Sequence, residues 1–117
     1  MAYNTKLADR VREALVHLPL VDEKEMFRGV CFMVDGKMCI CVSADEMLCR
    51  IDESEMEAAL EQNGCRQMMM NGRASKNYVF VAEEAIQSQK DFDNWVKLAL
   101  DFNPRAKASK KRKGSSG

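Results

Sequence analysis

The chain has 117 residues, 46% of them hydrophobic, and carries 18 basic and 18 acidic side chains. This length fits one domain, and the apolar content is too high for a disordered chain. No apolar run approaches the roughly 18 residues that cross a bilayer, and the N-terminal residues lack the apolar segment of a signal peptide. We therefore expect a cytoplasmic protein without a membrane segment.

The zero net charge hides an uneven distribution. Residues 104–117 hold six basic side chains and no acidic one, which leaves 12 basic and 18 acidic side chains in residues 1–103. Residues 104–117 are also rich in Lys, Ser and Gly, a composition that cannot bury a core. We predict a folded domain over residues 1–103 and a disordered basic tail over residues 104–117.

The first half of the chain reads as a helix followed by a hairpin. Apolar spacing predicts an amphipathic helix over residues 4–18, which Pro19 ends. An apolar run predicts a strand over residues 25–34. Asp35-Gly36 is a strong signal for a type I′ turn, and residues 37–43 are expected to return as the second strand.

The turn predicts how the two strands of this hairpin face each other. A two-residue turn places Phe32 opposite Cys39 and Cys31 opposite Ile40. One face of the hairpin then carries no charge, and we assign it to the main core. Its side chains are Phe27, Gly29, Cys31, Met33, Met38, Ile40, Val42 and Ala44.

The second half of the chain continues this alternation of strands and helices. We expect a strand over residues 47–51, and then a short helix that the capping box Ser54-Glu55-Met56-Glu57 opens and Gly64 closes. Strands over residues 66–70 and 78–81 should follow, joined by a polar, basic loop over residues 71–77. The last expected element is a helix over residues 88–102, which Pro104 stops. The order α-β-β-β-α-β-β-α predicts an α+β domain, in which helices bury the apolar face of an antiparallel sheet.

Residues that could carry chemistry are few. His17 is the only histidine, and no Ser-His-Asp order, Walker loop or Gly-x-Gly-x-x-Gly motif is present. The five cysteines are expected to be reduced, buried apolar residues. Strand spacing would put Cys39 and Cys41 on one face, where Cys49 could join them on a metal, but a second short ligand pair is missing. We predict no metal, no cofactor and no enzymatic activity.

Several stretches together resemble the TfoX N-terminal domain family. The stretch Met26-Phe-Arg-Gly-Val-Cys-Phe-Met-Val-Asp-Gly-Lys-Met38 is similar to the signature hairpin of that family. Asn71-Gly-Arg73, Lys76-x-Tyr-Val79 and the Trp95 helix resemble its later segments, so the resemblance covers about residues 5–103. It implies a sheet-and-helix sandwich like that of secretion chaperones and no catalytic residues. Competence regulators of the family carry a further C-terminal domain, which residues 1–117 do not include.

The leading hypothesis is a non-catalytic regulatory or protein-interaction domain. Candidate contact residues are the basic side chains of the hairpin, the 71–77 loop and the tail: Arg28, Lys37, Arg73, Lys76, Lys110, Lys111, Arg112 and Lys113. One alternative is an accessory protein that contacts nucleic acid weakly through the tail. A second alternative is a small enzyme or ligand-binding protein with a pocket lined by Cys and Met. Open sheet edges would also allow a homodimer.

Overall fold

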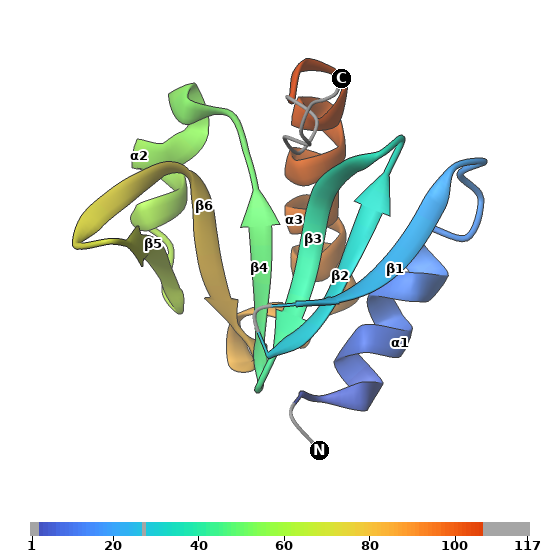
Figure 1. Cartoon of the computed structure of the whole chain (residues 1–117). Helices are drawn as coiled ribbons and strands as arrows, with labels where there is room; N and C mark the ends of the chain where they lie inside the picture. Colours follow the sequence, from blue (N-terminus) through green and yellow to red (C-terminus); the bar gives the residue numbers. More distant parts are fainter. Residues whose placement is uncertain (1–2, 27, 107–117) are drawn as a thin grey trace.

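The computed structural model describes residues 3–26 and 28–106. Within these residues, six strands form one antiparallel sheet in the order β1-β2-β3-β4-β6-β5 (Figure 1). The strands are β1 Val21–Met26, β2 Gly29–Val34, β3 Lys37–Ser43, β4 Glu46–Arg50, β5 Cys65–Met70 and β6 Arg73–Ala82. The α-helices are α1 Thr5–Ala14, α2 Met56–Leu60 and α3 Gln89–Phe102, and short 3₁₀ turns occur at Glu53–Glu55, Glu83–Ile86 and Asn103–Arg105. The predicted α+β class is confirmed.

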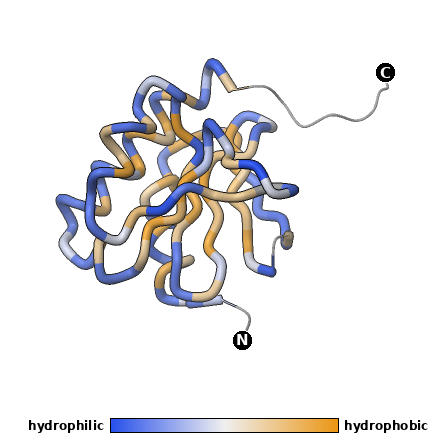
Figure 2. Tube along the Cα trace, turned by 90° about the vertical axis from the view of Figure 1, so that its left-hand side faces the viewer, coloured by the Kyte–Doolittle hydropathy of each residue, from blue (hydrophilic) through white to orange (hydrophobic). Residues whose placement is uncertain are grey.

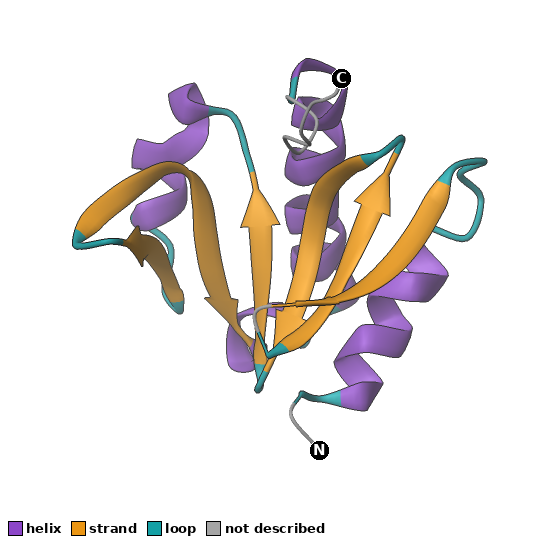
Figure 3. Ribbon diagram, in the orientation of Figure 1, coloured by secondary structure: helices purple, strands orange, loops and turns teal. Residues whose placement is uncertain are grey.

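Apolar side chains fill both faces of the sheet, but helices cover only one of them (Figure 3). The larger cluster joins one sheet face to all three helices, through residues such as Leu7, Met56 and Trp95. The smaller cluster, on the other face, is built from strand residues alone: Cys31, Met33, Met38, Cys41 and Leu48, with Met26, Met68, Tyr78 and Phe80 packed against them. The apolar segments accordingly lie inside the trace and the polar ones outside it (Figure 2).

The sheet contains one strand more than predicted. The segment expected as one strand over residues 25–34 is divided between β1 and β2, because Arg28 takes a left-handed backbone with φ 59°. Most of β1 escaped notice because residues 22–25 are all charged and exposed. Such charges are typical of an edge strand, where they discourage pairing with another chain.

The first helix is shorter than predicted. It begins after the N-cap Asn4, whose side chain accepts a hydrogen bond from the Leu7 N–H, and ends at Ala14 rather than at residue 18. Pro19 lacks an N–H and disfavours the helical conformation of the residue before it. The chain therefore leaves the helix in a tighter turn, in which the Leu18 N–H reaches the Leu15 carbonyl at 3.0 Å.

The central hairpin follows the prediction only next to its turn. Asp35 and Gly36 both have positive φ, and Met33 pairs with Met38 as expected. A bulge at Cys39 then shifts the register, so that Phe32 pairs with Ile40 and Cys31 with Cys41. The assignment of the faces is therefore wrong in part: on β2, the helix-covered face carries Val30, Phe32 and Val34, while Cys31 and Met33 lie on the other face.

The segment predicted as a polar loop over residues 71–77 is mostly strand. Only Asn71 and Gly72 form the turn, with φ values of 54° and 78°, and β6 begins directly at Arg73. A two-residue turn of this kind lets the strand resume at once. The predicted capping box is also wrong, because the side chain of Asp52, not Ser54, accepts the capping hydrogen bond, and the donor is the Ser54 N–H.

The end of the described chain folds back onto the hairpin. Pro104, expected to open the disordered tail, instead lies in a 3₁₀ turn, and Ala106 is buried. The buried Asn103 side chain donates a hydrogen bond of 3.1 Å to the Val34 carbonyl. Residues 107–117 lie outside the described residues, so the disordered tail stays a prediction for them.

Gly29 should tolerate no side chain. A Cβ there would collide with the carbonyl group of Val42, whose carbon would lie 2.9 Å away. We expect Gly29→Ala to lower the free energy of unfolding by on the order of 3 kcal/mol in urea melts. Gly36→Ala is the control, because its Cβ would meet nothing within 4 Å and only its φ of 77° opposes the change. That variant should lose about 1–2 kcal/mol, and equal losses would contradict the steric explanation.

Candidate functional site

The two basic residues predicted on the hairpin do not form one surface. Lys37 opens β3, and its Nζ donates hydrogen bonds to the carbonyls of Asn103 (3.3 Å) and Pro104 (3.4 Å). Arg28 is exposed in the turn before β2, at the opposite end of that strand from Lys37. Lys37 thus holds the end of α3 in place, as a cation at a helix C-terminus is suited to do.

The other predicted basic residues lie elsewhere again. Arg73 and Lys76 are exposed on β6 near the β5–β6 turn, where Arg73 lines an open hollow with Asn71, Ala74 and Ser75. Residues 110–113 are outside the described part of the chain. The four described candidates therefore occupy three separate places and form no continuous basic patch.

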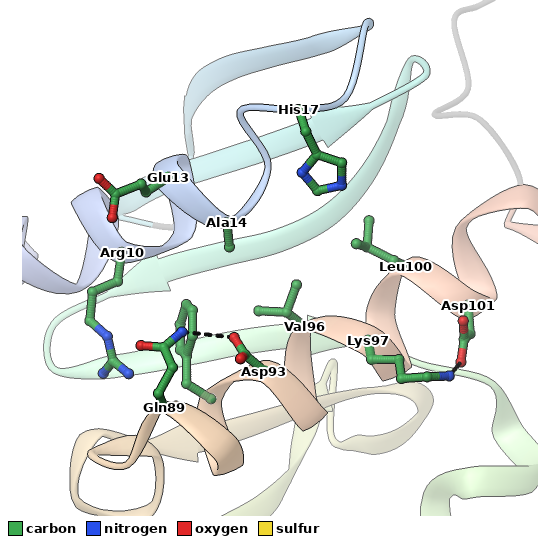
Figure 4. A pocket seen from close by; sticks show the side chains of 11 residues that line it. Arg10, Glu13, Ala14, His17, Gln89, Asp93, Val96, Lys97, Leu100 and Asp101 are labelled. Atoms are coloured by element: carbon green, nitrogen blue, oxygen red, sulfur yellow. Dashed lines mark hydrogen bonds and ion pairs between the residues drawn. The ribbon is translucent and has the colours of Figure 1, made fainter.

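A concave site lies between α1 and α3 (Figure 4). It is a groove of about 450 Å³. Its apolar floor and its charged or polar walls come from two helices far apart in sequence. The lining residues are Arg10, Glu13, Ala14 and His17 from α1 and the turn after it, and Gln89, Phe92, Asp93, Val96, Lys97, Leu100 and Asp101 from α3.

The walls of the groove carry both basic and acidic side chains, and several of them are fixed by hydrogen bonds. The Arg10 guanidinium donates a 2.7 Å hydrogen bond to the Ile86 carbonyl and lies 4.2 Å from the centre of the Phe92 ring. On α3, Gln89 donates to Asp93, and a hydrogen bond from Lys97 to Asp101 raises the pKa of Lys97. Glu13 and His17 line the α1 side of the groove, and their side chains make no hydrogen bond or ion pair within the described chain (Figure 4).

The groove has little of what acid–base catalysis requires. His17, its only imidazole, is exposed and has no carboxylate partner among the described residues, and the lining contains no Ser, Thr or Cys nucleophile. A catalytic base needs both a partner that orients it and a reacting group within reach. The arrangement is suited to holding an apolar segment between charged rims.

The cysteines are distributed differently from the prediction. Cys31 and Cys41 face each other across β2 and β3 and form a disulfide, so the expectation of five reduced thiols is wrong for this pair. The bulge turns Cys39 toward the helix-covered face and leaves Cys41 on the other one, so the two cannot chelate one metal. Among the described residues, no group of three or more Cys, His, Asp or Glu side chains could hold a metal ion.

Burial also makes the three free thiols poor nucleophiles. It raises the pKa of Cys39 to about 12, against the lowering effect of the Arg50 charge, and that of Cys65 to about 11. Burial likewise raises the pKa of Cys49 well above its usual value. Since the thiolate is the reactive form, these cysteines should react slowly at neutral pH.

The family model of the TfoX N-terminal domain matches residues 13–103. The chain belongs to the TfoX N-terminal domain family. No curated protein and no solved structure matches it. The matched segment of this TfoX N-terminal domain contains the whole sheet and both α2 and α3, and it includes the α3 wall of the groove.

Two features of this TfoX N-terminal domain, the groove and the buried Arg50 Nε, have no local signal in the sequence. The groove residues Glu13, Asp93 and Lys97 sit at the polar borders of two amphipathic helices, and only the packing of α1 beside α3 makes them neighbours. Arg50 looked like an ordinary strand residue, yet its Nε is buried without a hydrogen bond. No described helix is long and apolar enough to cross a membrane.

Thiol labelling should separate the cysteines by burial. With iodoacetamide at about pH 8, we expect slow labelling of the half-buried Cys65 and none of Cys39 and Cys49 until the protein is unfolded. The rate at Cys65 should rise as the pH approaches 11, where its raised pKa lies. Mass spectrometry of peptides gives the rates. Fast labelling of Cys39 in the folded protein would contradict the burial that raises its pKa.

Proposed function

We propose that this TfoX N-terminal domain is a non-catalytic cytoplasmic module that binds a protein partner, and that the groove between α1 and α3 is the binding site. The observation that carries the proposal is the composition of the groove. An apolar floor from Ala14, Val96 and Leu100 runs between exposed charges on both walls.

An amphipathic helix is the partner segment that suits such a groove. Its apolar stripe would lie on the floor of the groove. Its basic flanking residues would meet Glu13 and Asp93, and its acidic ones would meet Lys97. Charges at the rim of an interface set the choice of partner and the rate of association more than the affinity. The mixed signs here favour a partner with both acidic and basic flanks.

The alternatives find less support in the positions of their residues. The nucleic-acid alternative depends on Lys110, Lys111, Arg112 and Lys113, which lie outside the described residues. Within the described residues, the basic candidates are scattered over the surface and add no cluster of cations to that tail. A pocket lined by Cys39 and Cys41 is incompatible with their positions on opposite faces of the sheet.

Site-specific crosslinking in cells tests the proposed groove. A photoreactive amino acid in place of His17, which is exposed on the rim, should capture a discrete protein. The same amino acid in place of Glu57, exposed on α2 outside the groove, should not capture it. Equal capture at both positions would contradict the proposal, and nucleic acid as the captured species would favour the tail hypothesis.

A charge-reversal pair gives the quantitative test on the captured partner. Glu13→Lys combined with Asp93→Lys should weaken binding roughly tenfold, mainly by slowing association, because both charges lie on the rim. Glu57→Lys combined with Glu61→Lys changes the net charge by the same amount on α2 and at its C-cap, and should leave binding unchanged. Both pairs are exposed, so circular dichroism should show unchanged folding. Equal weakening by the two pairs would assign the effect to long-range charge rather than to the groove.

A further inference from the structure

Arg50 is a half-buried cation that the protein does not neutralise. Its Nε is buried and makes no hydrogen bond, and its one hydrogen bond, from Nη1 to the Met38 carbonyl, is long at 3.4 Å. A guanidinium has five N–H donors, so most of its hydrogen-bonding capacity is unused within the described chain. Leaving buried donors of a charged group unmade is costly.

The missing partner is not a carboxylate elsewhere in the chain. All 18 Asp and Glu side chains belong to the described residues, since positions 1–2, 27 and 107–117 contain none. Among the described arginines, Arg12, Arg66 and Arg105 each form an ion pair, whereas Arg50 forms none. Arg50 is therefore left without a carboxylate partner among the described residues.

Aromatic rings hold the Arg50 guanidinium in place. Its central carbon lies 5.6 Å from the centre of the Tyr78 ring on β6 and 6.0 Å from that of Phe102 on α3. Such contacts position a guanidinium and offset part of its burial, but they leave the N–H donors in its plane unoccupied. Burial raises the pKa of Tyr78, and the nearby positive charge of Arg50 opposes this rise.

The other cations at this end of the sheet are already engaged. Lys37 contacts the carbonyls of Asn103 and Pro104, and Arg105 pairs with Asp52 while its own guanidinium lies 5.5 Å from the Phe102 ring. Because Arg105 is neutralised by Asp52, Lys37 and Arg50 are the cations at this end of the sheet that form no ion pair among the described residues. The local potential favours an anion, and Arg50 is the group with free donors to bind it.

We propose that Arg50 is the anchor of an oxyanion-binding site at this end of the sheet. The ligand group is a phosphate or a carboxylate, whose oxygens match the planar fork of donors on a guanidinium. The aromatic pair Tyr78 and Phe102 fixes the guanidinium before the anion arrives. The site is independent of the α1–α3 groove, so either can fail without the other.

Titration with inorganic phosphate and, separately, with acetate tests the site. Each is compared with sodium chloride at equal ionic strength, on the full chain, with the Nε–H signal of Arg50 followed by NMR. A saturable shift of this signal beyond the chloride effect supports the proposal. Saturation by phosphate alone assigns the source as a phosphate group, and saturation by acetate as well assigns it as oxyanions in general. If neither anion exceeds chloride, the proposal is overturned.

Variants make the assignment specific to Arg50. In Arg50→Gln, stabilisation of the thermal unfolding midpoint by the active anion should require a concentration roughly tenfold higher or more. Arg73→Gln removes an exposed arginine from the β5–β6 turn and should respond like the natural protein. Arg50→Lys, which keeps the charge and loses the fork, should fall between them and guards against a misfolded Gln variant. An unchanged response in both Arg50 variants would overturn the proposal.

Discussion

The fold depends on a central hairpin that is apolar on both faces while helices cover only one. Phe32 and Ile40 are fully buried against the helices, and Cys31 and Cys41 are just as buried on the other side. The bulge at Cys39 decides which side chains meet the helices, because it turns both Cys39 and Ile40 toward them. On the face without helices, strand residues alone must bury the apolar cluster, and Tyr78 and Phe80 pack against it.

The elements with strong local signals could be predicted from the sequence. The Asp35-Gly36 turn and the apolar stripe of α3 identify themselves, because backbone sterics and helical periodicity act over a few residues. The charged strand β1 gives no such signal, since its place at the sheet edge comes from pairing with β2. The bulge at Cys39 was equally hidden: turn chemistry sets the first pairs of a hairpin, and packing further along can shift the rest.

The candidate sites were harder to predict, because residue type says little about what a side chain touches. Lys37 looked available for a partner, yet it is engaged with backbone carbonyls 66 and 67 positions away. Arg50 gives no signal in the sequence, yet in the fold it forms no ion pair with any described acidic residue and its Nε is buried without a hydrogen bond. Both findings depend on contacts between distant segments, which a single sequence does not encode locally. The family membership is consistent with the fold and assigns no residue a role.

The attachment of the two chain ends has a mechanical consequence. Near the N-terminus, the Asn4 N–H is bonded to the Ala44 carbonyl just past the end of β3, while Asn103 is bonded to Val34 at the opposite end of the hairpin. Residues 4 and 103 accordingly lie at opposite ends of the central hairpin. A force that separates residues 4 and 103 loads these two single hydrogen bonds before it reaches the ladder between β2 and β3. Stretching should therefore release the ends of the domain before the sheet opens.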